Sequence, residues 1–199
     1  MTNAPSNISV GQIAALSPTA GTGGLWRAPL GTALPTDTTT ALTNTYTGLG
    51  YIDEDGVTIS IDRPSTPQYS WGGLKLASLQ QHYNPSLSFK LVQVLDADVL
   101  KAVHSDTNVT VTAATQSAGT ITTVEWNPLL NVNSVWVVAG FYQSATFRLA
   151  IPDARITSTR DMRLTHKALA VWDCTLELFP DSAGNFAYQI WDDGVVAVA

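Results

Sequence analysis

The stretch between Asp106 and Arg148 decides the fold, and it contains three runs of strand-forming residues: Asn108-Val-Thr-Val-Thr-Ala-Ala-Thr115, Thr120-Ile-Thr-Thr-Val-Glu-Trp126 and Ser134-Val-Trp-Val-Val-Ala-Gly-Phe-Tyr142. Only Glu125 carries a formal charge within this interval. Soluble monomers usually protect exposed strands with Lys, Pro or inward-facing charges, because an uncharged edge pairs with other chains. Strands without this protection either have their edges covered by their own fold or use them to bind copies of the same chain. We expect the second, which makes assembly the function.

Composition agrees with a mainly β protein of one domain. The chain has 199 residues, of which 13% are charged, about half of the ~25% found in average soluble domains. Threonine is abundant, and β-branched residues suit a pleated sheet better than a helix. The net charge of −6 argues against a protein that grips nucleic acid by neutralising its phosphates. It suits a protein that lets DNA pass without binding it.

The chain divides into an N-terminal arm (1–24), a β-domain (25–192) and a short C-terminal tail (193–199). The arm is uncharged and rich in small residues, so we expect neither a signal peptide nor a fixed structure there. We also expect no membrane-spanning segment. Cys174 is the single cysteine, which excludes an intramolecular disulfide, and its strand pattern predicts a buried thiol.

Strands are expected at 25–28, 57–63, 145–151, 154–159, 167–179 and 185–191, with a turn at Pro152–Asp153. Pro64, Pro67 and the Gly72–Gly73 pair predict a long hairpin or loop around 69–76 that leaves the main sheet. Residues 95–104 predict the one helix, with Asp96 as its N-cap. Many strands, one helix and no βαβ alternation predict a β-sandwich or barrel with a flanking α-helix.

No residue pattern predicts an enzyme, a cofactor or a metal site. The three histidines have no metal-ligand spacing. The Asp53–Gly56 cluster lacks the alternation and distal Glu of a calcium loop, so an acidic turn is favoured over calcium binding. The adjacent Asp192 and Asp193 face opposite sides of a strand, which favours solvated charges over an acid–base pair. A basic-rich stretch (148–167) has acids interleaved, which favours a mixed-charge surface over a nucleic-acid groove.

Several segments resemble the major tail (tail tube) proteins of long-tailed, siphovirus-type bacteriophages. They are Gly24–Asp37, Leu49–Thr58, Ser70–Gly73, Phe147–Arg155 and Leu178–Asn185. Together they span most of the chain beyond the arm, whereas residues 107–144 carry little of the resemblance. None of the segments is a catalytic motif.

The resemblance implies a β-sandwich with one flanking helix, whose inner strands join those of neighbouring subunits in one continuous barrel. It implies hexameric rings that stack into a tube through which the genome is ejected. The implied partners are copies of the chain and the tape measure, terminator and tip proteins. The implied location is the virion tail, after a period in the host cytoplasm. DNA passes without specific binding.

These expectations assign roles to three groups of residues. The candidate ring-stacking loop comprises Tyr69, Trp71, Gly72, Gly73 and Leu74. The candidate inter-subunit strand edge comprises Val135, Val137 and Phe141, and the candidate helix face that packs on the sheet comprises Val99, Leu100 and Val103. The alternative function is a β-sandwich binding module, carbohydrate-binding or adhesin-like, on a virion or cell surface. It requires exposed aromatic residues clustered on one face.

Overall fold

The computed structural model describes residues 14–18 and 23–195, so most of the predicted arm and the last four residues of the predicted tail lie outside the described part. The chain is mainly β, as predicted. Its elements are β1 (Leu25–Pro29), β2 (Thr47–Gly48), β3 (Ile52–Asp62), β4 (Ser65–Tyr69), β5 (Lys75–Gln80), β6 (Asn84–Leu91), α1 (Ala97–His104), β7 (Val109–Thr112), β8 (Ile121–Val124), β9 (Ser134–Tyr142), β10 (Ala145–Thr159), β11 (Trp172–Leu178) and β12 (Tyr188–Asp192).

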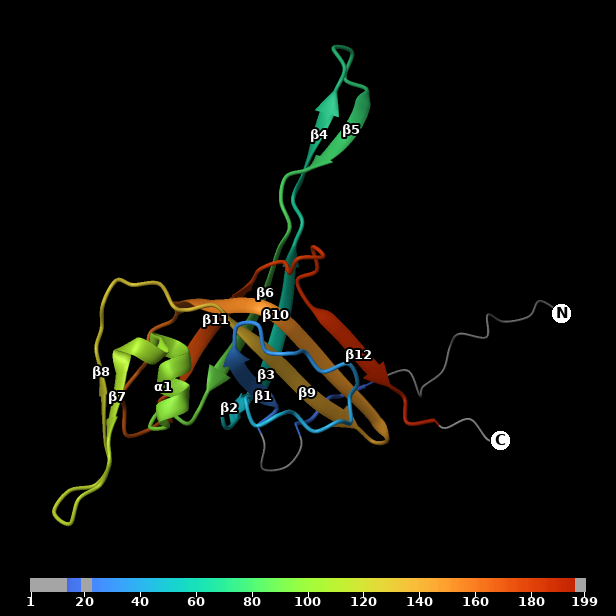
Figure 1. The fold of residues 1–199 in the computed structure, drawn as a ribbon. Coiled ribbons are helices and arrows are strands. Elements are labelled where there is room, and N and C mark those ends of the chain that lie inside the picture. Colours follow the sequence, from blue (N-terminus) through green and yellow to red (C-terminus); the bar gives the residue numbers. More distant parts are fainter. Residues whose placement is uncertain (1–13, 19–22, 196–199) are drawn as a thin grey trace.

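The main sheet is antiparallel and folds over itself into two layers. Its strand order is β2-β1-β9-β10-β11-β6-β3, and β12 also pairs with β10. The first half of β10 pairs with β9 and β12, and its second half pairs with β11. This strand therefore belongs to an outer layer (β2-β1-β9-β10-β12) and to an inner layer (β10-β11-β6-β3), whose strands are labelled in Figure 1.

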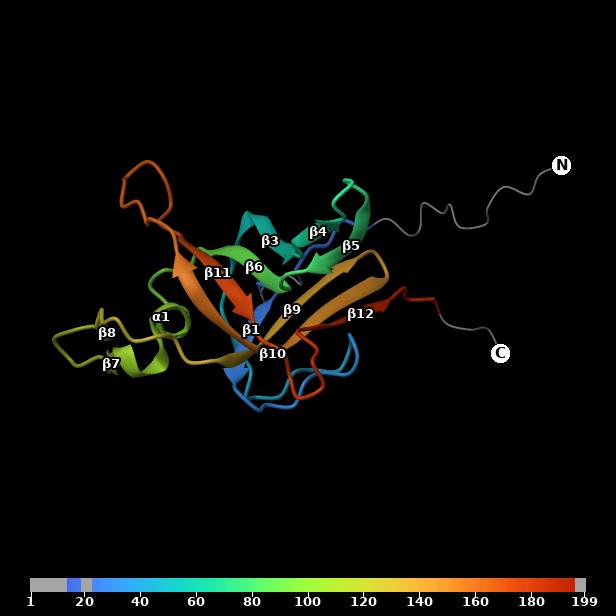
Figure 2. The same ribbon diagram turned by 90° about the horizontal axis from the view of Figure 1, so that it is seen from above.

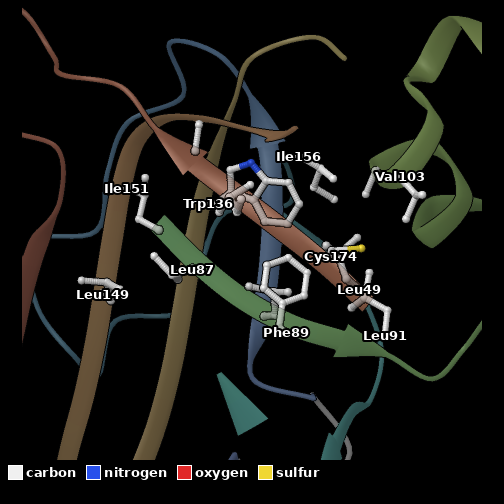
Figure 3. Packing of buried hydrophobic residues seen from close by; sticks show 14 of the residues in the cluster. Leu49, Leu87, Phe89, Leu91, Val103, Trp136, Leu149, Ile151, Ile156 and Cys174 are labelled. Atoms are coloured by element: carbon white, nitrogen blue, oxygen red, sulfur yellow. The ribbon is translucent and has the colours of Figure 1, made fainter. Parts of the chain in front are cut away.

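The core lies between the two layers. Along β6 and β11 buried apolar residues alternate with partly exposed polar ones, which is the pattern of a strand with one buried face. Trp136 of β9 packs its ring against Phe89 of β6, with 6.0 Å between the ring centroids, and donates from Nε1 to Ser134 Oγ at 2.9 Å. Figure 3 shows these rings beside Cys174 and the aliphatic residues of both layers. Full burial of a Leu-sized side chain contributes about 1.5–3 kcal/mol, so this cluster dominates the stability.

Helix α1 closes one end of the core, as the prediction of a single flanking helix required. The Asp96 carboxylate accepts hydrogen bonds from the backbone amides of Asp98 and Val99 and caps the helix. Val99, Leu100 and Val103 are buried, and Val99 and Val103 belong to the main core cluster.

Two hairpins leave the body of the molecule. Strands β4 and β5 pair only with each other and project far beyond the sandwich, in agreement with the predicted hairpin (Figures 1 and 2). Strands β7 and β8 form the second hairpin, beyond α1 on the side away from β12. Its base is fixed because the Asn108 and Asn127 amides bond each other at 2.8 and 3.4 Å.

Two turns were predicted wrongly. At both places the strand continues through a bulge. Pro152–Asp153 is a bulge inside β10, where the register with β9 shifts between Ile151 and Ala154. The acidic Asp53–Gly56 segment is a bulge inside β3, where Gly56 has a φ of 68°. A bulge kinks a strand without ending it and often uses a glycine at positive φ, so composition alone resembles a turn.

Candidate assembly surfaces

The inner layer has one apolar and one polar face. Opposed residues of β3, β6 and β11 share a face, so Val57, Phe89 and Cys174 all point into the core. The intervening residues point away from it, and on β6 they are Ser86, Ser88 and Lys90. No described element covers this second face, which also carries Thr58, Ser60, Asp62, Arg155, Asp173, Thr175 and Glu177. The bare face is therefore rich in hydroxyl groups and acids.

Two cations lie on this face, Lys90 and Arg155, and their surroundings differ. Lys90 Nζ pairs with Asp55 and with Asp53, the latter at 3.4 Å, and these hydrogen bonds raise the pKa of Lys90. Arg155 stands opposite Glu177 in the ladder and stacks its guanidinium over the ring of Phe179 at 5.0 Å. At this surface a polyanion meets Lys90 already paired with two acids, whereas Arg155 forms no ion pair within the described residues and its Nε has no hydrogen-bond partner.

The inner layer also ends in unpaired backbone on both sides. Within the described residues, β3 pairs with β6 on one side and with no strand on the other. At the opposite end, residues 155–159 of β10 pair with β11 but have left β9, whose last partner on β10 is Ala154. The Asn131 amide donates to the Ile156 carbonyl at 3.2 Å, and no strand of the described part reaches the residues beyond it. Neither of these edges was predicted from the sequence.

The predicted edge at Val135, Val137 and Phe141 is wrong for the chain on its own. Strand β9 lies in the middle of the outer layer, because β1 pairs with its residues 134–138 and β10 pairs along its other side. Val135 and Val137 are fully buried, and Phe141 exchanges backbone hydrogen bonds with Ser17. The uncharged stretch reflects burial at these positions.

The tip of the β4–β5 hairpin carries the residues predicted to stack rings. Trp71 is fully exposed, and Tyr69 and Leu74 keep more than half of their surface. Ser70 and Leu74 close the turn, with Ser70 N donating to Leu74 O at 2.8 Å, and Gly73 has a φ of 80° that only glycine adopts without strain. The hairpin thus displays large apolar side chains on a defined turn far from the core.

A groove of about 560 Å³, lined by both apolar and polar side chains, opens between β3 and the segment before β12. Ile59 and Ile61 of β3 continue the core-facing side of the inner layer, yet they are 48% and 52% exposed because the outer layer does not reach them. Leu149, Leu178 and Phe186 form its other walls, and Phe186 meets Tyr83 edge to face at 5.0 Å. Arg63 is the one charged residue of its described lining.

A family model described as Phage tail tube protein matches residues 14–199. The chain belongs to this family. No curated protein matches the sequence. As a phage tail tube protein, the chain is a structural component of the virion tail and assembles as a multimer with other tail components.

The single cysteine of this tail tube protein is buried. Burial raises the pKa of the Cys174 thiol to about 12, so almost no nucleophilic thiolate forms at neutral pH. In residues 14–18 and 23–195, no group of three or more His, Cys, Asp or Glu could hold a metal ion. Within the same ranges, no helix has the length and apolar character needed to cross a membrane.

Arg148 was predicted to belong to a mixed-charge surface, but it does not lie on the surface. It is buried, and its Nη1 donates to the backbone carbonyls of Asp37 and Thr40 at 2.8 and 3.0 Å, which ties the 37–40 loop to β10. The exposed Trp71, Trp126 and Trp191 lie on a hairpin tip, beside α1 and on β12. Three separate elements do not form one sugar-stacking platform, so this arrangement does not favour the binding-module alternative.

Two features of the tail tube protein were missed from sequence. The groove forms only because β3 and the segment before β12 lie close together in the fold. The two segments are far apart in the sequence, so no local sequence pattern indicates that they meet. Asn131 was missed because it lies in an irregular segment, although an asparagine between apolar neighbours in an uncharged loop is a signal of side-chain capping.

Proposed function

We propose that six copies of the chain form a closed ring and that the rings stack into the tail tube of a siphovirus-type phage. The tube is the conduit through which the genome is ejected into the host. The observation that carries the proposal is the pair of unpaired edges at the two ends of the inner layer. The family membership supports assembly into a tail tube, and the two edges support strand pairing as the contact between copies.

In the ring, the outer side of β3 in one copy pairs with residues 155–159 of β10 in the next. Each copy then contributes four strands, β10, β11, β6 and β3, to one continuous barrel. A closed barrel has no unpaired strand edge, so both edges of each subunit are paired in the tube. In the monomer the same edges are free to pair with another chain. The two edges are different surfaces, so the contact is head-to-tail and closes at the number of subunits that the rotation allows.

The bare polar face of the inner layer lines the channel. The core face is already covered by the outer layer and α1, so the uncovered face is the one available to a lumen. Ser and Thr hydroxyls dominate it, its acids outnumber its cations, and Lys90 is paired with Asp53 and Asp55. The acids of such a wall repel DNA phosphates, and its hydroxyl groups carry no charge to neutralise them. The genome therefore passes without specific binding.

The β4–β5 hairpin stacks one ring on the next. Its length and its exposed Tyr69, Trp71 and Leu74 support a contact beyond the ring that carries it, and burial of aromatic anchors is a common source of interface energy. The assembled tube contacts the tape measure, terminator and tip proteins. Before assembly the subunit resides in the host cytoplasm.

Negative-stain microscopy and sedimentation of the purified chain over a concentration series test the proposal. We expect monomers when dilute and tubes of uniform width, with six-fold end views, when concentrated. A chain that stays solitary, or that forms only small closed particles, would overturn it.

A further inference from the structure

We infer that the groove beside β3 is the socket for Leu129 and Leu130 of the adjacent subunit in the same ring. The inference rests on the proposed ring and adds a side-chain contact that determines how neighbouring copies fit. The occupant is thus a second copy of this chain, at its segment between β8 and β9.

Leu129 and Leu130 are presented by a segment with a fixed backbone. They are 69% and 75% exposed, although the residues on both sides are anchored. Asn127 Oδ1 accepts from the Leu129 amide at 3.0 Å and pairs with Asn108. Asn131 donates to the carbonyls of Val103 and Ile156 at 2.8 and 3.2 Å. Because the backbone of this segment is already fixed, little entropy is lost when the two leucines bind. We call Leu129 and Leu130 on this segment the knob.

The anchor at Ile156 places this knob at the edge that joins the next copy. Residues 155–159 of β10 are the proposed partner of β3, and Asn131 is bonded to that same edge. Asn131 also reaches α1, so the segment lies on the core-facing side of the inner layer. Ile59 and Ile61 face the core side of β3 and stay half exposed. When the two edges pair, the knob of one copy and the groove of the next are on the same side of the barrel wall.

The groove offers apolar contacts to the knob. Its lining includes Ile59, Ile61 and Phe186 beside polar groups, and Arg63 lies there with its guanidinium 4.6 Å from the Tyr83 ring. Burial of two leucines against apolar side chains, with polar groups at the rim, is typical of a specific interface. Figures 1 and 2 both place the β8–β9 segment on the α1 side of the molecule, away from β12.

The first experiment is Leu129→Asp with Leu130→Asp, and Leu95→Asp is the control because Leu95 is exposed and outside both surfaces. The double variant should keep the wild-type Tm and remain monomeric at concentrations roughly tenfold or more above the wild-type threshold for assembly. The control should assemble as wild type does. Wild-type assembly of the double variant would overturn the inference, as would rings that form but do not stack, since the contact would then lie between rings.

A complementation experiment tests direct contact. Ile59→Lys with Ile61→Lys should also yield a folded monomer, since long lysine side chains keep their ammonium groups in water. Mixed in equal amounts, the Asp variant and the Lys variant should form rings in which they alternate. In such a ring each Asp knob meets a Lys groove, and each wild-type knob meets a wild-type groove. No rings from the mixture would overturn the inference. Wild-type chain that forms no rings would instead overturn the proposed function on which it rests.

Discussion

At the scale of single residues, Asp37 shows how a surface carboxylate can organise a loop. Its oxygens accept hydrogen bonds from the Thr40 hydroxyl and from the Thr40 and Thr39 amides, at 2.6, 2.6 and 2.8 Å. These bonds, led by that of the Thr40 hydroxyl, lower the pKa of Asp37 to about 2 from 3.8. Arg148, whose Nη1 binds the carbonyls of the same loop, adds a smaller attraction.

The pKa of Asp37 predicts a contribution to acid stability. A carboxylate whose pKa is lower in the folded state stabilises the fold above its unfolded pKa and loses that effect as pH falls. We expect the Asp37 contribution to be complete above about pH 4 and to vanish towards pH 2. Urea unfolding at a series of pH values should therefore show a shallower acid slope for Asp37→Asn. Thr40→Val should reduce the slope in part, and an unchanged slope in Asp37→Asn would contradict the assignment.

Val137 gives the second prediction at this scale. It is fully buried between β1 and β10, so Val137→Lys places an ammonium group in the core. We expect a loss of more than ~3 kcal/mol in the free energy of unfolding, or no folded protein. Thr110→Lys, on an exposed position of β7, is the control and should stay within about 0.5 kcal/mol of wild type. A stable, folded Val137→Lys monomer would mean that the side chain is not in the core.

At the scale of elements, the β4–β5 hairpin should act on stacking and not on ring formation. It pairs with no strand of the described sandwich, so Trp71→Ala with Leu74→Ser should leave the fold and the rings intact. Loss of two exposed anchors should lower the yield of tubes by roughly tenfold or more at equal concentration. Micrographs should show separate rings, and Leu164→Ser, at another exposed leucine, should form normal tubes. Loss of rings together with tubes would count against a role in stacking.

Elements were predictable from sequence where the pattern is local. The alternation in β6 and β11, the Asp96 cap and the Gly72–Gly73 turn each depend on neighbours in the chain, and the corresponding elements are present. The bulges in β3 and β10 were not predictable, because Gly56 and Pro152 are typical of turns as well. The edge assignment at Val135 and Val137 failed for a different reason. An uncharged strand fits both a buried centre and a sticky edge, and only the pairing of β9 with β1 and β10 decides between them.

At the scale of the whole molecule, the bare face of the inner layer should be enclosed in the tube. Ser88→Cys places a thiol in the middle of this face, and the native Cys174 does not interfere because it is buried. In monomers, a small maleimide and a polymer-linked maleimide should both label Ser88→Cys. In tubes, only the small reagent should enter the lumen.

The matched control for this experiment is Thr123→Cys, on the β7–β8 hairpin beyond α1. It should react with both reagents in monomers and in tubes. Equal labelling of Ser88→Cys by the large reagent in tubes would show that the polar face lies outside, and the choice of channel wall would then be wrong.

The continuity of β10 has a mechanical consequence. Fifteen residues run without a break from the outer layer to the edge proposed to bind the next subunit. A pull on that edge is therefore carried along covalent backbone into the far layer, and no loop lies in between to absorb it. In the tube proposed above, we expect each subunit to pass such a load on to its neighbours, so that the wall bends as one elastic body.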